Sequence, residues 1–219
     1  MTSAAVVASI YIVWLTGAVD FRLYFGNVPP TIAVVFVCVA GLGALYVLQK
    51  YSSFSVYRRS TFRQGLCTAA VLAIPFMIAV TVADVVFRFP IDINVALPSA
   101  ILFYPAMGFL AQIALHIVPF AILLSLGNIL FPASRLSWRL CVSIVLASLP
   151  EAAFQVVSSM SSGEPALIDA FVAVSLFFFG VVELYLYRRF DYATMYAFRI
   201  FYYCYWHLAW GNMRIYWLF

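Results

Sequence analysis

The run TIAVVFVCVAGLGALYVLQ, residues 31–49, contains neither a charged residue nor a proline. A helix of this length rises about 28 Å at 1.5 Å per residue, close to the roughly 30 Å hydrocarbon core of a bilayer. Because comparable apolar runs recur along the chain, this stretch indicates a membrane-spanning helix that the sequence repeats several times.

The composition supports the same fold class. Of 219 residues, 66% are hydrophobic and 9% are charged, against roughly 25% charged residues in an average soluble domain. So few charges cannot cover a water-soluble globule. The composition therefore excludes a soluble enzyme, a disordered chain and a nucleic-acid-binding protein, and we expect no nucleic-acid partner despite the net charge of +4.

The apolar windows between charged, proline and glycine residues predict seven transmembrane helices in a single all-α membrane domain, residues 1–219. These windows are residues 4–19, 31–49, 65–87, 106–131, 137–159, 166–187 and 193–218. The stretch INVALPSAILFYP, residues 93–105, precedes the fourth span, and we expect an ordinary loop there, with a re-entrant segment as the alternative.

The positive charges alternate between the predicted connections. The second, fourth and sixth connections carry Lys50, Arg58, Arg59, Arg63, Arg135, Arg139, Arg188 and Arg189. The first and third hold one arginine each, beside an aspartate, and the fifth has Glu164 and no basic residue. Since basic loops stay in the cytoplasm, the pattern predicts a cytoplasmic N-terminus and seven crossings.

The remaining general features favour a bacterial plasma membrane. The loops are short, and the apolar start of the chain has no basic residue before it, so we expect a retained first span rather than a cleaved signal. Four widely separated cysteines, each within an apolar run, are typical of small buried hydrophobic residues rather than of disulfides or metal ligands.

Ionisable residues at bilayer depth are costly and therefore mark candidate sites. Counting residues from each predicted entry face places His116, Glu151 and His207 near the midplane, where the three can meet. Pro150 should kink the fifth span beside Glu151. Gln155 shares a helix face with Glu151, and Gln112 shares one with His116.

The last predicted span carries a polar stripe at helical spacing, formed by Arg199, Tyr203, His207, Gly211 and Arg214. Gly211 would allow a neighbouring segment or a substrate to approach closely. We expect Glu183 and Arg199 to form a structural ion pair.

The second half of the chain resembles the intramembrane protease family that includes type II CAAX prenyl endopeptidases and bacteriocin-processing or abortive-infection proteins. The resemblance lies in SLFFFGVVELYLYRRFDYATMYAFRIFYYCYWHLAWGNMR, residues 175–214, and in LPEAAFQ, residues 149–155. The first segment is similar to the family's FxxG helix followed by a helix with HxxxN or HxxxD. The second is similar to an EExxxR motif in which some of the defining residues are replaced.

The resemblance implies site residues and also shows what is missing. His207 falls on the histidine of the last motif, with Gly211 at the position of its partner and Asn212 one residue later. Glu151 takes the second glutamate, Pro150 replaces the first, and Gln155 replaces the arginine. The middle FxxxH histidine is absent, and His116 in ALHIVPF, residues 114–120, is the only substitute the sequence offers.

Two functions therefore stand side by side. In an active protease, Glu151 with His116 would act as general base, and His207 with Asn212 would stabilise the oxyanion during cleavage of a membrane-proximal peptide. In the alternative, the protein is a non-enzymatic scaffold or accessory subunit that binds other membrane proteins through its aromatic surface.

Two further functions, a transporter and a haem protein, are supported by fewer features of the sequence. A proton-coupled transporter could use Glu151 and the histidines as a relay, and a b-type haem could be held by His116 and His207. The sequence has no HExxH and no i,i+4 histidine pair, so we expect neither a metal nor another cofactor.

Overall fold

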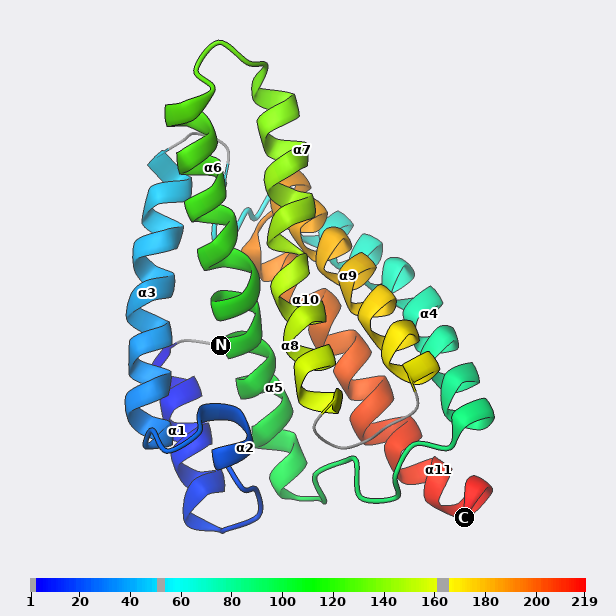
Figure 1. Ribbon diagram of the computed structural model, residues 1–219. Helices are drawn as coiled ribbons and strands as arrows, with labels where there is room; N and C mark the ends of the chain where they lie inside the picture. Colours follow the sequence, from blue (N-terminus) through cyan, green and yellow to red (C-terminus); the bar gives the residue numbers. More distant parts are fainter. Residues whose placement is uncertain (1–2, 51–53, 161–165) are drawn as a thin grey trace.

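The computed structural model describes residues 3–50, 54–160 and 166–219, and every regular element in these ranges is a helix (Figure 1). The first half contains α1 (Ser3–Leu15), α2 (Arg22–Phe25), α3 (Pro30–Lys50), α4 (Phe62–Phe87), α5 (Ser99–Ala111), the π-helical segment η1 (Gln112–Ile117) and α6 (Val118–Leu130). The second half contains α7 (Leu136–Ala147), α8 (Leu149–Met160), α9 (Ala166–Arg189), α10 (Tyr192–Tyr203), the π-helical segment η2 (Cys204–Trp210) and α11 (Gly211–Leu218).

Five helices of the described chain are long and apolar enough to cross a membrane. They are α3, α4, the continuous helix Ser99–Leu130, the helix pair Leu136–Val157, and the helix Leu167–Arg189 within α9. The two other predicted spans are not among these candidates. Helix α1 has 13 residues, about 20 Å by helical rise and shorter than the bilayer core. The helix from Tyr192 onward is long, but it is rich in tyrosine and tryptophan and contains two arginines.

The second, fourth and sixth predicted connections, which carry most of the basic residues, lie at one end of the bundle. Helices α3, α6 and α9 all end in the upper part of Figure 1, whereas α1, α4 and α8 end in the lower part. The predicted basic connections therefore follow helices that end on the same side. Glu164, which was assigned to the fifth connection, lies outside the described residues.

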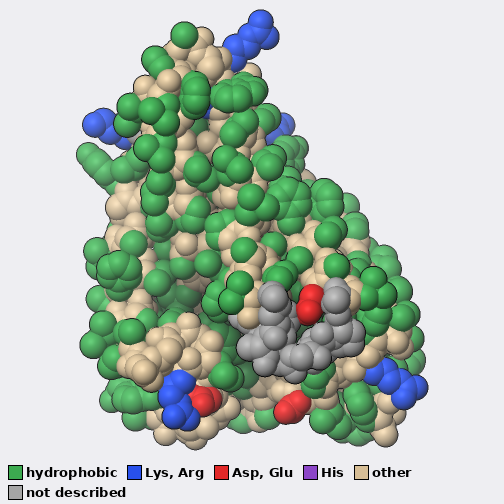
Figure 2. Space-filling model, viewed as in Figure 1, with side chains coloured by type: hydrophobic (Ala, Val, Ile, Leu, Met, Phe, Trp, Pro, Cys, Tyr) green, Lys and Arg blue, Asp and Glu red, His purple; other side chains and the backbone are tan. Residues whose placement is uncertain are grey.

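The surface between the two ends is apolar. In the view of Figure 2, hydrophobic side chains cover the middle of the molecule, and the lysine and arginine side chains project near its upper end and lower edge. Such a surface suits contact with lipid rather than with water. Three of the four cysteines, Cys67, Cys141 and Cys204, belong to it; the prediction that they are buried is wrong, and only Cys38 is buried.

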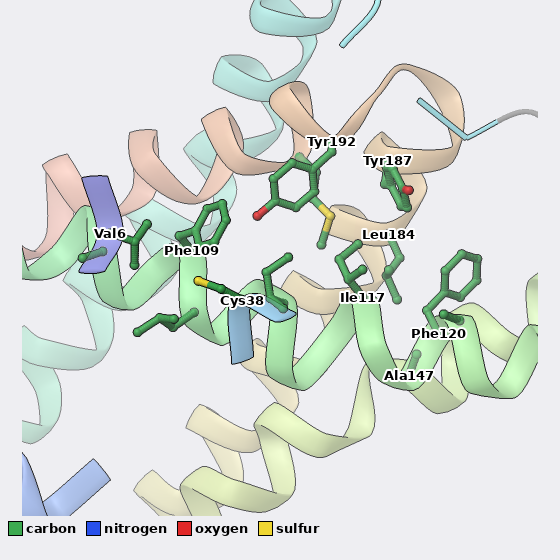
Figure 3. Close-up of a cluster of buried hydrophobic side chains, with 14 of the residues drawn as sticks. Val6, Cys38, Phe109, Ile117, Phe120, Ala147, Leu184, Tyr187 and Tyr192 are labelled. Atoms are coloured by element: carbon green, nitrogen blue, oxygen red, sulfur yellow. The ribbon is translucent and has the colours of Figure 1, made fainter. Parts of the chain in front are cut away.

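The largest buried cluster surrounds the central helix α5–η1–α6. Side chains from α1, α3, α7 and α9 pack against it, including Val6, Cys38, Ala147, Leu184 and Tyr187 (Figure 3). Because this helix is covered on several sides, polar groups that it carries are removed from lipid. Packing around this helix therefore places His116 in the protein interior, where it is 0% exposed.

The loop expected over residues 93–105 extends only to Pro98. Helix α5 begins at Ser99 and includes Pro105. Pro98 is the N-cap residue of this helix. Backbone N–H groups at the start of a helix have no intrahelical acceptor, so the N–H that proline lacks is not missed there. The apolar segment Ser99–Tyr104 thus adds to the span because its buried residues Phe103 and Tyr104 pack in the core.

Candidate functional site

Four buried ionisable side chains from four different helical segments meet inside the bundle. They are His116 from η1, Glu151 from α8, Glu183 from α9 and Arg199 from α10. His116 and Glu183 are 0% exposed, Arg199 is 1% exposed and Glu151 is 8% exposed. We call these four residues the polar cluster.

Arg199 binds both carboxylates of the cluster in a bidentate manner, Glu151 end-on and Glu183 side-on. Its Nη1 and Nη2 donate to Oε1 and Oε2 of Glu151, both at 2.7 Å. Its Nε and Nη2 donate to Oε1 and Oε2 of Glu183 at 2.8 and 2.9 Å. A fifth contact, from Nη1 to the hydroxyl of Tyr203 at 3.2 Å, uses the last N–H of the guanidinium. The expected Glu183–Arg199 ion pair is therefore present, as one half of a larger bridge.

His116 closes the cluster through both ring nitrogens. Its Nδ1 lies 3.2 Å from the carbonyl oxygen of Ala147, and its Nε2 lies 2.7 Å from Oε2 of Glu151. Nε2 is also 3.4 Å from Oε2 of Glu183. Nε2 lies 3.3 Å from Nη2 of Arg199 as well. The imidazole therefore contacts both carboxylates and the guanidinium through one nitrogen, and the backbone of α7 through the other.

Helix irregularities place His116 and Glu151 opposite each other. His116 lies in the π-helical segment η1, which ends just before Pro119, a residue with no N–H for the preceding turn. On the facing side, the helix is interrupted at Ser148 between α7 and α8, directly before Leu149 and Pro150. The kink expected at Pro150 thus presents the Ala147 carbonyl and the Glu151 carboxylate to one imidazole ring.

Gly180 gives the ring its space on the third side. A Cβ atom at this position of α9 would lie 2.6 Å from Cε1 of His116 and 3.2 Å from Cβ of Ser148. Gly108 of α5 has a similar role, since its Cβ would lie 3.2 Å from Cδ of Arg199. The cluster therefore depends on two glycines that allow close approach.

Gln112 extends the cluster by one hydrogen-bonded residue. Its Nε2 donates to Oε1 of Glu183 at 2.8 Å and to the carbonyl oxygen of Met195 at 3.0 Å. The amide oxygen has no partner among the described residues. Gln112 and His116 share a helix face, as predicted from their spacing, and both face α9 and α10.

His207 does not join the cluster. Its Nδ1 donates to Oδ1 of Asn94 at 2.6 Å, and its ring stacks on Tyr104 at 3.8 Å between centroids. The depth count placed His207 level with Glu151, but Arg199, eight positions earlier on the same helix, occupies that level. Helix α10 begins within the protein, where Tyr192 and Ala193 donate backbone hydrogen bonds to the segment near residue 55, so the count from the membrane face was wrong.

The partner of His207 comes from a loop, not from its own helix. Asn94 lies between α4 and α5, and Gly211 leaves room for it, because a Cβ there would lie 2.5 Å from Nδ2 of Asn94. The close approach that Gly211 was expected to allow is thus used by this loop. Sequence reasoning missed Asn94, since a single asparagine in a connection carries no spacing signal.

The two other predicted site residues lie away from these groups. Asn212 is exposed, and its side chain donates to the carbonyl of Leu208 in the preceding turn. Gln155 is exposed as well. Asn212 follows His207 by five positions, one residue past the shared face of the helix, so the two side chains diverge. Gln155 follows Glu151 by four positions, and the prediction that it supports Glu151 from a shared face is wrong, since in the described part of the chain no hydrogen bond joins the two side chains and Gln155 lies at the surface.

A second buried ion pair fixes the far end of the last helix. Arg214 donates from Nε and Nη2 to the two carboxylate oxygens of Asp84, both at 2.7 Å, and Trp210 Nε1 donates to the same carboxylate at 2.7 Å. Asp84 also accepts from the backbone N–H of Phe89. Asp84 is therefore fully engaged in joining α4 to α11.

The donor set of the polar cluster does not suit a metal or a haem. Ligand atoms of His116, Glu151 and Glu183 lie within 4.8 Å of one another, close enough for one ion. However, Arg199 already supplies the cation between these carboxylates, and a metal would have to displace it. The pair of histidines considered for a haem is not brought together: both ring nitrogens of His116 contact Ala147 and Glu151, and His207 lies apart, bonded through Nδ1 to Asn94.

Comparison with known proteins gives no relative: no family model, no curated protein and no solved structure matches the chain. The resemblance of residues 149–155 and 175–214 to intramembrane proteases thus stays a prediction. The fold and the surface establish the class, namely an all-helical, multi-pass membrane protein whose helices contact the lipid bilayer.

Proposed function

We propose that this protein is a non-enzymatic membrane module, an accessory subunit or scaffold of a bacterial plasma-membrane complex, in which the polar cluster fixes the arrangement of the helices. One observation carries the proposal: Arg199 donates four hydrogen bonds to the oxygens of Glu151 and Glu183. A general base must take a proton from water, and a carboxylate that accepts two hydrogen bonds from a guanidinium and also contacts an imidazole is a weak base.

The positions of the other predicted catalytic residues support the same proposal. Hydrolysis would need an oxyanion donor near the base, but His207 donates to Asn94 and Asn212 donates within its own helix. A catalytic pair would also need access to water, and three of the four cluster residues are at most 1% exposed. A closed cluster of mutually bonded side chains instead joins α8, α9, α10 and η1 at one point.

A membrane-embedded protease related to the CAAX prenyl endopeptidases is the second candidate. The observation that favours it is the 2.7 Å contact between His116 Nε2 and Glu151 Oε2, a pair able to activate a water if Arg199 releases Glu151. Its substrate would be a membrane-proximal peptide, because only the bilayer surrounds the bundle at this depth.

Stability and activity together distinguish the two functions. Glu151→Gln removes one of the two carboxylates that Arg199 binds, and we expect a loss of about 3–5 kcal/mol in the free energy of unfolding. Gln155→Ala, at an exposed position of the same helix, is the control and should unfold like the wild type. Thermal unfolding in lipid nanodiscs measures both variants.

Activity is measured on the same preparations. Each protein is incubated with a membrane-anchored peptide that has a cleavable segment next to the bilayer, and products are detected by mass spectrometry. We expect no cleavage by the wild-type protein. Cleavage that disappears in a folded Glu151→Gln variant would overturn the scaffold and favour the protease.

A further inference from the structure

The face formed by α7 and α9 carries an open groove at the basic end of the bundle. It has a volume of about 650 Å³ and is lined by apolar side chains of both helices, including Val145 and Val181, together with Tyr185 and three arginines, Arg58, Arg188 and Arg189. None of the residues lining it is acidic. An apolar channel that ends in three cations is suited to an anionic amphiphile.

Along α9, the apolar residues of the groove come before the arginines, which matches the order of chain and charged group in an anionic amphiphile. Val181, Tyr185 and Arg188 follow one another at spacings of four and three, so they lie on one face of the helix. Helix α9 has 24 residues, about 36 Å by helical rise, and therefore outreaches the roughly 30 Å core. Its terminal arginines then lie at the level of lipid phosphates, and Val181 lies at the level of acyl chains.

Two of these arginines, Arg188 and Arg189, are available to a ligand. Arg188 and Arg189 are exposed, and neither forms an ion pair within the part of the chain that the structure describes. The neighbouring acid, Asp191, is 0% exposed and accepts hydrogen bonds from the backbone N–H groups of Arg58 and Thr194. Its carboxylate is directed into the N-terminus of α10, so the groove keeps its positive charge.

We propose that this groove binds one anionic phospholipid, with the phosphate at Arg188 and Arg189 and an acyl chain along Val145 and Val181. The charge complementarity selects an anion, and the lipid-facing apolar walls select a chain over a soluble ion. The inference is independent of whether the polar cluster is structural or catalytic, because it uses none of its residues.

Cys141 reports on the groove directly. This exposed cysteine lies in its lining, so the variant Cys67→Ser/Cys204→Ser leaves it as the exposed cysteine available to a maleimide. In neutral detergent micelles, added phosphatidylglycerol should slow labelling of Cys141 at least tenfold, whereas phosphatidylcholine should not. Glycerol phosphate, which has the charged group without chains, should not protect it either.

Two double variants, which each remove two positive charges, test the role of the groove arginines. In the same background, Arg188→Gln/Arg189→Gln should weaken protection by phosphatidylglycerol by about tenfold or more, since each basic contact with an anionic lipid contributes severalfold to affinity. Arg59→Gln/Arg135→Gln removes two charges that do not line the groove and should leave protection unchanged. Three outcomes would overturn the proposal: equal effects of the two double variants, protection by glycerol phosphate, or protection by an acidic peptide but not by the lipid.

Discussion

Arg214 binds both carboxylate oxygens of Asp84 at 2.7 Å, although 130 positions separate the two residues in the chain. Both side chains are 0% exposed. The pair ties the C-terminal end of α4 to α11, and the guanidinium also donates to the carbonyl oxygens of Phe89 and Pro90. Each helix end is therefore held by charge as well as by apolar contact.

Replacing Asp84 should destabilise the protein strongly. Asp84→Asn leaves a buried guanidinium without its anion, and we expect a loss of about 3–5 kcal/mol in the free energy of unfolding. Thermal unfolding in detergent measures it. Asp20→Asn breaks the exposed Asp20–Arg22 pair instead and should leave the transition unchanged. Equal midpoints for the two variants would contradict the role given to Asp84.

Gly180 should not accept a side chain. In Gly180→Ala the new Cβ would lie 2.6 Å from Cε1 of His116, whose ring is held by Ala147 and Glu151. Overpacking of this kind costs about 1–3 kcal/mol. Gly43→Ala is the matched control, since nothing lies within 4 Å of a Cβ there, and it should be neutral or slightly stabilising. The expected order of unfolding temperatures is Gly43→Ala at or above wild type, and Gly180→Ala below both.

Arg199→Lys should fail to replace arginine despite keeping the charge. An ammonium has three donors around one nitrogen and cannot make two bidentate contacts with carboxylates. At least two charge-assisted hydrogen bonds are lost, each contributing about 1.5–3 kcal/mol. Arg63→Lys, at an exposed position of α4, is the control and should unfold like the wild type. A lysine variant as stable as Arg63→Lys would show that the bridge contributes little.

His207 should hold the loop between α4 and α5. His207→Ala removes the hydrogen bond to Asn94 and the stacking on Tyr104, so amides of residues 90–97 should exchange with deuterium about tenfold faster or more. Asn212→Ala changes an exposed side chain and should leave exchange in this loop as it is. Unchanged exchange in both variants would mean that the loop is held by other contacts.

The cluster could be predicted in part. Spacing and depth named His116, Glu151, Gln112 and the Glu183–Arg199 pair, because burying an ionisable group in a bilayer requires a partner. The same reasoning could not join these into one network, since it assigned no contact between Arg199 and Glu151. Registers between helices depend on packing, which the hydropathy pattern of a single helix does not contain.

By itself the sequence determined the class of the protein, the positions of the long apolar helices and the kink beside Glu151. Each follows from local chemistry: the class and the helices from the length of the apolar runs, and the kink from the missing N–H of Pro150. Only the tertiary structure decided that His207 pairs with Asn94, that Arg214 pairs with Asp84, and that Gln155 and Asn212 point away. These depend on where α10 begins inside the bundle and on glycines that let particular helices approach. A shift of one helical residue turns a side chain by about 100°, and only the packed bundle fixes that angle.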